Sequence, residues 1–321
     1  MKTIPDVLFR QARLQPDALA WRLTDGALEA RVRDAAGVLR GMGFENGDRF
    51  AIWAPNCAEW IIITLAGQAL GGVLVPLNTR YKGAEAADIM RRAHCKYLFT
   101  VEGFLGHDYP AMLAGEDLPG LRETVIIRGK DEKAAFDAFM ARDRIAGDLP
   151  DVDASALSDI IFTSGTTGAP KGAMTCHGQN VQVFEAFTKA IGMNADDRYL
   201  VVNPFFHSFG YKAGWLACLV CGASIFPLAM YDPVDVLARI ERDKITTMPG
   251  APTIFQTLLD CPELKNHDIS TLSIATTGAT TIPIDLIRRM REDLGIDEVY
   301  SAYGLTEATG VVSMCASGDD F

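Results

Sequence analysis

The amino-acid sequence predicts an α/β protein made of two doubly wound parallel-sheet subdomains. Short apolar runs alternate along the chain with segments whose apolar residues recur at helical intervals, which is the pattern of parallel strands covered by helices. The runs are apolar throughout, which indicates strands buried on both faces. The chain has 321 residues, more than the ~250–300 at which a single hydrophobic core usually stops growing.

The first half alternates in this way up to a charged stretch at 130–148, which we expect to contain a helix and a surface linker. Glycine turns separate the elements, such as Gly47-Asp48 before a strand and Gly71-Gly72 after a helix. The expected strands are 49–53, 73–76, 97–100 and 125–128, and the expected helices are 5–14, 29–42, 58–70 and 85–93.

The second half repeats the alternation, and we divide the chain into subdomains 1–175 and 176–321. Residues 213–230 carry no charge and approach the ~20 residues that span a bilayer. Gly222 and Pro227 interrupt them, so we expect a buried helix, a turn and a strand rather than a membrane span. The expected strands are 159–163, 199–202, 224–226, 245–248, 273–275 and 298–300, and the expected helices are 177–191, 211–221, 232–243, 251–260 and 283–293.

The composition excludes several classes of protein. With 49% hydrophobic and 22% charged residues, the chain can bury a large core and is not disordered. Its net charge of −11 disfavours nucleic acid and anionic lipid as partners. Seven dispersed cysteines, and charges and a proline where a signal peptide has its apolar core, favour a cytoplasmic protein. Cys218 and Cys221 have metal-like spacing but lie in an apolar segment, so we interpret them as buried cysteines.

One loop, residues 163–172 (Thr-Ser-Gly-Thr-Thr-Gly-Ala-Pro-Lys-Gly), has the composition of a phosphate-binding site. It follows an expected strand and precedes the helix expected at 177–191. Its glycines let the backbone approach a ligand, and its hydroxyls and Lys171 are donors, with no carboxylate among them. The alternative is an ordinary Gly/Thr-rich turn. It is not a Walker loop, because Pro170 and Gly172 flank the lysine.

This loop closely resembles the phosphate-loop signature of the AMP-binding, adenylate-forming family, which includes acyl-CoA synthetases, aryl-CoA ligases, luciferases and peptide-synthetase adenylation domains. Residues 203–210, 277–280 and 300–307 resemble three further motifs of the family in the same order. The resemblance implies that two α/β subdomains of an acyl-CoA-synthetase-like N-terminal domain are present. It also implies that most of the β-barrel and the whole C-terminal lid domain are absent.

The family joins a carboxylate to the α-phosphate of ATP, releases pyrophosphate, and passes the acyl group to coenzyme A. The resemblance therefore implies ATP, Mg²⁺ and coenzyme A. It places Lys171 at the β- and γ-phosphates, Thr306 at the α-phosphate, Tyr303 on adenine, and Thr163 and Glu307 at Mg²⁺. The implied catalytic residues are Lys171, His207, Thr306 and Glu307; the nucleotide-binding residues are Thr163, Ser164, Gly165, Thr166, Thr167, Gly168, Lys171, Gly278, Ala279, Ser301, Ala302, Tyr303 and Thr306; the acyl-binding residues are His207, Phe209, Gly278 and Gly304.

Peptide-synthetase members place an aspartate near the position of His207, so the resemblance favours a plain carboxylic acid over an amino acid. The residues at 78–80 and 98–106 resemble those of bacterial ligases that activate side-chain acids in steroid-ring breakdown. Medium-chain fatty acids and aromatic acids are the alternative substrates. A family edge strand near 20–23 is expected to be missing, and the chain is expected to adenylate poorly. A catalytically inactive nucleotide- and acyl-binding module and an unrelated phosphohydrolase or kinase are the alternative functions.

Overall fold

The computed structural model describes residues 2–18, 25–129, 131, 134–163, 170–316 and 318–319. Contacts between residues divide the chain into two units. The first unit comprises Met1–Asp17 and Asp25–Val181, and the second comprises Ala18–Thr24 and Gln182–Phe321. The expected missing edge strand near 20–23 lies outside the described residues.

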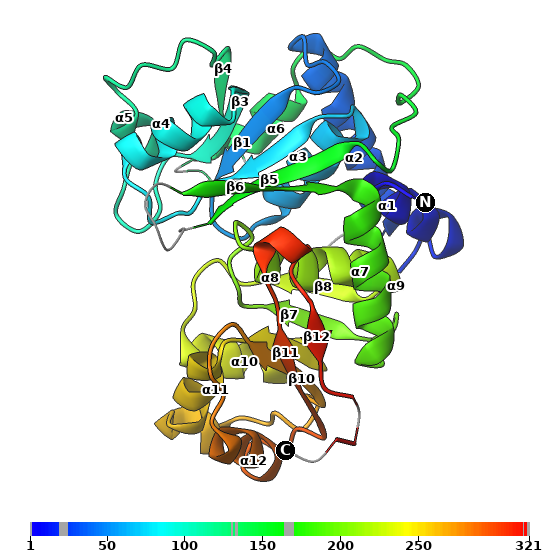
Figure 1. Cartoon of the computed structure of the whole chain (residues 1–321), viewed down its shortest axis with the longest axis vertical. Coiled ribbons are helices and arrows are strands. Elements are labelled where there is room, and N and C mark those ends of the chain that lie inside the picture. The colour runs from blue at the N-terminus through cyan, green and yellow to red at the C-terminus, as the bar shows by residue number, and fades with distance from the viewer. Residues whose placement is uncertain are drawn as a thin grey trace. The chain divides into compact units, whose positions relative to one another are not determined.

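The described strands of the first unit form a six-stranded sheet in the order β4-β3-β1-β2-β5-β6 (Figure 1). Neighbouring strands are parallel, except that β5 and β6 are antiparallel. These strands are β1 (Arg49–Trp53), β2 (Val73–Pro76), β3 (Cys95–Val101), β4 (Glu123–Arg128), β5 (Leu157–Thr163) and β6 (Lys171–Cys176).

The helices of this unit differ in how they are buried. In α3, every residue except Glu59 is buried, which explains its nearly continuous apolar sequence. The first helix, α1, begins with a capping box, in which Thr3 and Asp6 exchange hydrogen bonds between side chain and backbone. The helices are α1 (Ile4–Leu14), α2 (Asp25–Gly41), α3 (Ala58–Ala69), α4 (Gly83–Arg92), α5 (Tyr109–Met112) and α6 (Ala134–Met140).

The described strands of the second unit form another six-stranded sheet, in the order β12-β11-β10-β9-β7-β8. Its strands are parallel except for the pair β11 and β12. They are β7 (Arg198–Val201), β8 (Ser224–Pro227), β9 (Thr247–Gly250), β10 (Ile274–Gly278), β11 (Glu298–Tyr303) and β12 (Ser313–Met314). An antiparallel edge strand on an otherwise parallel sheet is common in such folds.

Helices flank this second sheet (Figure 1). One hydrophobic cluster joins α10, α11 and α12 to the strands through side chains such as Leu237, Phe255, Ala275 and Met290. The helical elements are α7 (His177–Ala190), α8 (Ser208–Gly210), the π-helix η1 (Tyr211–Leu216), α9 (Ala217–Cys221), α10 (Pro233–Asp243), α11 (Pro252–Leu259), the 3₁₀ helix η2 (Pro262–Asn266), α12 (Ile284–Glu292) and the 3₁₀ helix η3 (Thr306–Ala308).

The α/β prediction is confirmed, and the segment 213–230 forms the helix, turn and strand that its sequence predicts. Within the described residues, no helix is long and apolar enough to cross a membrane. The helix expected at 130–148 covers only Ala134–Met140 among the described residues.

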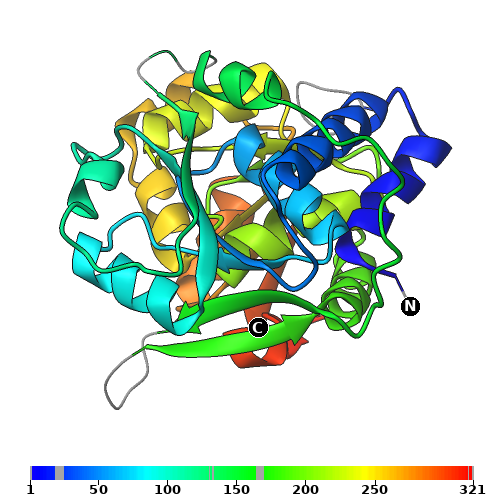
Figure 2. The same ribbon diagram turned by 90° about the horizontal axis from the view of Figure 1, so that it is seen from above.

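The sequence did not predict β6, which lies between the phosphate loop and the predicted helix at 177–191, formed as α7 (His177–Ala190). Thr163 pairs with Lys171 across β5 and β6, and Figure 2 shows the two strands as arms of a hairpin. Along β6, Ala173 and Thr175 are buried while Gly172 and Met174 are exposed. Such alternation of buried and exposed residues is typical of a strand with one face exposed to solvent.

Candidate functional site

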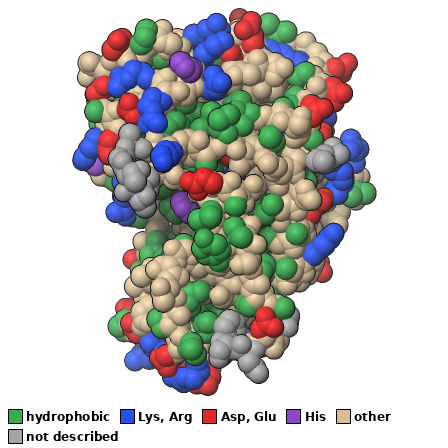
Figure 3. All heavy atoms as spheres, in the orientation of Figure 1, with side chains coloured by type: hydrophobic (Ala, Val, Ile, Leu, Met, Phe, Trp, Pro, Cys, Tyr) green, Lys and Arg blue, Asp and Glu red, His purple; other side chains and the backbone are tan. Residues whose placement is uncertain are grey.

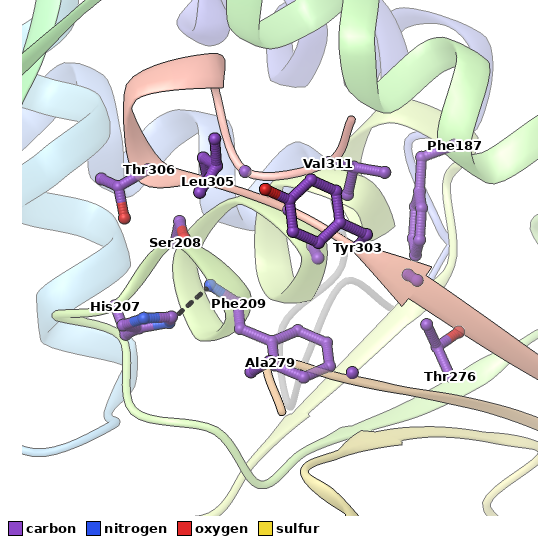
Figure 4. Close-up of a pocket in the computed structure, with 15 residues that line it drawn as sticks. Phe187, His207, Ser208, Phe209, Thr276, Ala279, Tyr303, Leu305, Thr306 and Val311 are labelled. Atoms are coloured by element: carbon purple, nitrogen blue, oxygen red, sulfur yellow. Dashed lines mark hydrogen bonds between the residues drawn. The ribbon is translucent and has the colours of Figure 1, made fainter. Parts of the chain in front are cut away.

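A pocket in the second unit gathers most of the site residues predicted there. Strands β10 and β11, helix α7, residues 207–213 and the turn 304–311 form its walls (Figure 4). Its empty volume is about 710 Å³, part of it open to solvent. Of the predicted residues, it is lined by His207, Phe209, Gly278, Ala279, Ala302, Tyr303, Gly304 and Thr306.

The pocket lies where the parallel strands β10 and β11 end, the usual ligand position in open α/β sheets. At two glycines there, an added side chain would collide with the backbone of a neighbouring segment. A Cβ on Gly278 would overlap the carbonyl oxygen of Ala302, and a Cβ on Gly304 would overlap that of Gly310. These two glycines therefore let the strand ends and the turn approach each other closely.

The turn that follows β11 holds its shape by backbone hydrogen bonds. The amide of Gly310 donates to the carbonyl of Leu305 at 2.9 Å, and the amide of Val312 donates to that of Tyr303 at 2.9 Å. Thr306 is buried at the start of η3, and Glu307 follows it with an exposed side chain. The turn thus places a hydroxyl inside the pocket wall and a carboxylate at the surface.

The surroundings of His207 favour its neutral imidazole form. Its Nδ1 accepts a hydrogen bond from the backbone amide of Phe209 at 3.1 Å, drawn as a dashed line in Figure 4. The side chain is exposed, but surrounding protein atoms desolvate it and lower the pKa of His207. With Nδ1 accepting, the proton lies on Nε2, which is then a donor.

Exposed apolar side chains lie on the wall of this pocket and next to it in the sequence. Tyr303 is 58% exposed, and Leu305 and Val312 are similarly exposed. Figure 3 shows hydrophobic side chains gathered over this part of the second unit. An exposed aromatic ring at a pocket offers a face on which a planar ligand ring can stack.

In the first unit, the predicted phosphate loop joins β5 to β6. Lys171 is exposed and Thr163 is half-buried, while Ser164, Gly165, Thr166, Thr167 and Gly168 lie outside the described residues. Sequence reasoning missed Arg92, at the end of α4. Its guanidinium donates to the carbonyl of Pro170 at 2.7 Å and lies 5.2 Å from the ring centroid of Phe162. Arg92 thus adds a cation beside the end of the loop.

A buried polar network fixes the base of the same hairpin. Both carboxylate oxygens of Asp159 accept hydrogen bonds, from Ser158 at 2.7 Å, Thr175 at 2.8 Å and Asn180 at 3.0 Å. All four side chains are buried. The network ties β5 to β6 and to the start of α7.

His177 lies next to this network and is fully buried. Its Nδ1 accepts the backbone amide of Ile4 at 3.3 Å. Burial lowers the pKa of His177 from its usual 6.5 to about 4, although the negative charges of Asp159 and Asp6 act to raise it. The imidazole is therefore neutral at neutral pH.

The donor set fits Mg²⁺ only as a partner of bound phosphate. Among the described residues, no group of three or more His, Cys, Asp or Glu side chains could hold a metal ion. Mg²⁺ commonly binds through one or two carboxylates together with substrate phosphates, and Glu307 is an exposed carboxylate of the second unit. Cys218 is buried and Cys221 is half-buried. Burial raises the pKa of both thiols, that of Cys221 to about 12, which favours their protonated form.

Comparison with known proteins identifies the class of protein. The sequence model of the family described as AMP-binding enzyme matches residues 8–321, so the chain belongs to that family. It is 44% identical over 330 residues to the 3-[(3aS,4S,7aS)-7a-methyl-1,5-dioxo-octahydro-1H-inden-4-yl]propanoyl:CoA ligase of Mycobacterium tuberculosis (strain ATCC 25618 / H37Rv). It is 41% identical over 336 residues to the ligase of the same name from Rhodococcus jostii (strain RHA1). The matches cover 100% and 99% of this chain but only 65% of each relative's length.

Solved structures show the same fold. The anthranilate CoA ligase AuaEII in complex with anthranoyl-AMP superposes with a TM-score of 0.90 at 22% identity, over 100% of this chain and 62% of that one. The N-terminal domain of FACL13 from Mycobacterium tuberculosis superposes with a TM-score of 0.87 at 24% identity, over 99% of this chain and 79% of that one. The two-sheet fold is therefore that of an acyl-CoA-synthetase N-terminal domain.

Proposed function

We propose that this chain is the nucleotide- and acyl-binding part of an AMP-forming acid–thiol ligase, with 1–175 and 176–321 as its two subdomains. The pocket at the ends of β10 and β11 carries the proposal, because it gathers the residues that the family resemblance assigns to adenine and the acyl group. The ligase names of the relatives support the same reaction. Free cysteines throughout the chain support a cytoplasmic location.

The reaction brings a carboxylate to a triphosphate, so the site must neutralise charge and hold two anions in line. Lys171 and the loop donors would bind the β- and γ-phosphates, and Thr306 would bind the α-phosphate. Tyr303 would stack on adenine, with Gly278, Ala279, Ser301 and Ala302 along the nucleotide. Thr163 and Glu307 would hold Mg²⁺, which neutralises phosphate charge when bound.

We further propose that the acid carries a fused ring system with keto groups. The curated relatives are named for a propanoyl group on a methyl-dioxo-octahydroindene, a saturated bicycle with two ring oxo groups. Phe187, Phe209, Ala213, Leu305 and Val311 give the pocket apolar walls, which suit a saturated ring system. His207 and Gly304 would lie along the acyl group. Medium-chain fatty acids are the alternative, supported by a human medium-chain acyl-CoA ligase at 28% identity.

Binding of a non-hydrolysable ATP analogue to this chain tests the nucleotide site by calorimetry. Lys171→Ala should weaken binding about 10–100-fold, since hydrogen bonds to charged groups contribute roughly 1.5–3 kcal/mol. Lys189→Ala, which removes another exposed lysine, is the matched control and should bind as the unsubstituted chain does. Equal binding by the two variants would overturn the assignment of Lys171.

ATP–pyrophosphate exchange with a panel of carboxylic acids then separates the candidate functions. Exchange that depends on the acid supports the ligase. Nucleotide and acid binding without exchange supports an inactive binding module, and phosphate release without any acid supports a phosphohydrolase. Because the chain spans about two thirds of its relatives' length, binding is the first measurement and exchange the second.

A further inference from the structure

A threonine hydroxyl in the pocket wall has no partner within the described part of the fold. Thr276 lines the pocket from strand β10 and is only 2% exposed. Its hydroxyl makes no hydrogen bond to another described residue. Burying a hydroxyl without a partner costs free energy, and valine has nearly the same shape without that cost. The hydroxyl of Thr276 is therefore available to a group bound in the pocket.

The next residue of the same strand provides a comparison. Successive side chains of a strand point to opposite faces of the sheet, so Thr276 faces the pocket and Thr277 faces the other side. Thr277 is fully buried, and its hydroxyl also lacks a partner among the described residues. Of these two unpaired hydroxyls, the one on Thr276 is placed to meet a ligand.

Thr276 lies at one end of the pocket. In Figure 4 its side chain points towards the ring of Phe187, whereas His207 and Thr306 lie at the opposite end. Phe187 also lines the pocket and is buried. Thr306 is the residue proposed at the α-phosphate, to which the carboxylate of the acid is joined. The hydroxyl of Thr276 is thus a polar group at the end of the pocket away from the reacting carboxylate.

We propose that Thr276 determines specificity by donating a hydrogen bond to a ring oxo oxygen of the bound acid; this inference rests on the proposed function. In the acid for which the relatives are named, a propanoyl group separates the carboxylate from the rings. With the carboxylate at Thr306, the rings extend towards Thr276. A hydroxyl has one proton to donate, and a ring oxo oxygen accepts it. Sites built to hydrogen-bond a substrate group reject analogues that lack the group.

The test measures binding of two acids to this chain by calorimetry: the methyl-dioxo-octahydroindene propanoate and its analogue without ring oxygens. The unsubstituted chain should bind the diketo acid about tenfold more tightly than the deoxygenated acid. Thr276→Val removes the hydroxyl and keeps the shape, so this preference should fall below about threefold through weaker binding of the diketo acid. Thr276→Ser keeps a hydroxyl and should retain the preference.

Thr277→Val is the matched control, because it makes the same change at a buried hydroxyl on the other face of the strand. It should retain the tenfold preference. The preference compares two acids on one variant, so a smaller folded fraction of that variant does not change it. A full preference in Thr276→Val, or an equal loss of preference in Thr277→Val, would overturn the proposal.

The unsubstituted chain separates failure of this inference from failure of the proposed function. If it binds the two acids equally, the role of Thr276 is refuted while the acyl site stands. If it binds the ATP analogue but neither acid, the acyl site itself is refuted, and the role of Thr276 with it.

Discussion

The hairpin base of the first unit and the pocket of the second unit use polar groups in opposite ways. At the hairpin base, Asp159 is buried and its carboxylate is satisfied by Ser158, Thr175 and Asn180. At the pocket, Tyr303 and Glu307 are exposed. The first arrangement stabilises a fold, because its donors and acceptors are used internally. The second exposes the aromatic ring of Tyr303, which lines the pocket and can contact a ligand.

The two histidines show the same difference. Both accept a backbone amide through Nδ1, from Ile4 at His177 and from Phe209 at His207. His177 is fully buried, whereas His207 is exposed and lines the pocket of the second unit. A histidine that accepts a backbone amide can therefore be a packing residue or a site residue, and its exposure decides between them.

The largest expected effect on stability is at Asp159. Asp159→Ala removes the acceptor of three buried hydrogen bonds. It should lower the free energy of unfolding by about 3 kcal/mol or more, because breaking a buried hydrogen-bond network is among the most destabilising single changes. Ser158 and Asn180 keep other acceptors, the carbonyls of Thr175 and Cys176. Urea unfolding followed by circular dichroism measures it. Asp143→Ala, at an exposed position, is the control, and an equal effect from both variants would show that the network does not stabilise the first unit.

The next largest expected effect is a pH dependence of the free energy of unfolding, caused by His177. Its pKa is about 4 in the folded chain against 6.5 for the free side chain, so between these values the unfolded chain binds a proton that the folded chain does not. The free energy of unfolding should therefore fall as the pH decreases from 6.5 to 4, by up to about 3 kcal/mol. The carboxylates of Asp6 and Asp159 oppose the shift, but burial outweighs them.

Variants can isolate this pH effect. His177→Asn keeps an acceptor for the amide of Ile4 but cannot titrate, so it should lose most of the decrease between pH 6.5 and 4. His94→Asn changes an exposed histidine at a positive φ of 54°, which asparagine tolerates, and it should keep the decrease. Urea unfolding across this pH range measures both, and identical slopes in the two variants would contradict the assignment to His177.

The sequence predicted those parts of the pocket that lie in contiguous motifs. Gly278 and Gly304 were named because they lie in segments that resemble motifs of the family, and a side chain at either position would overlap a neighbouring carbonyl. Motifs of this kind are contiguous, so a single sequence contains them. Leu305 also lines the pocket and lies inside a recognised motif, so it could have been named.

Other parts of the fold and of the site depend on tertiary packing, which no local sequence pattern predicts. Phe187 and Ala213 reach the pocket only because α7 and η1 pack against this sheet. The strand β6 was not predicted, because its alternation is carried by only two buried residues, Ala173 and Thr175. Arg92 meets Pro170 across 78 residues of sequence. Such contacts follow from the tertiary fold and not from neighbouring residues.

The smallest expected effect on stability is at Tyr303. Unlike the network at the hairpin base, this residue should affect ligand binding and leave stability nearly unchanged. Tyr303→Ala removes a ring that is 58% exposed, so the free energy of unfolding should change by no more than about 0.5 kcal/mol. Affinity for an ATP analogue should fall about tenfold, because stacking of a base on an aromatic ring contributes roughly 1–3 kcal/mol. Tyr303→Phe keeps the ring and should bind the ATP analogue as the unsubstituted chain does.

Inorganic triphosphate, which has no base, separates base binding from phosphate binding. Its affinity should be unchanged in Tyr303→Ala and lower in Lys171→Ala. A loss of triphosphate affinity in Tyr303→Ala would contradict this separation.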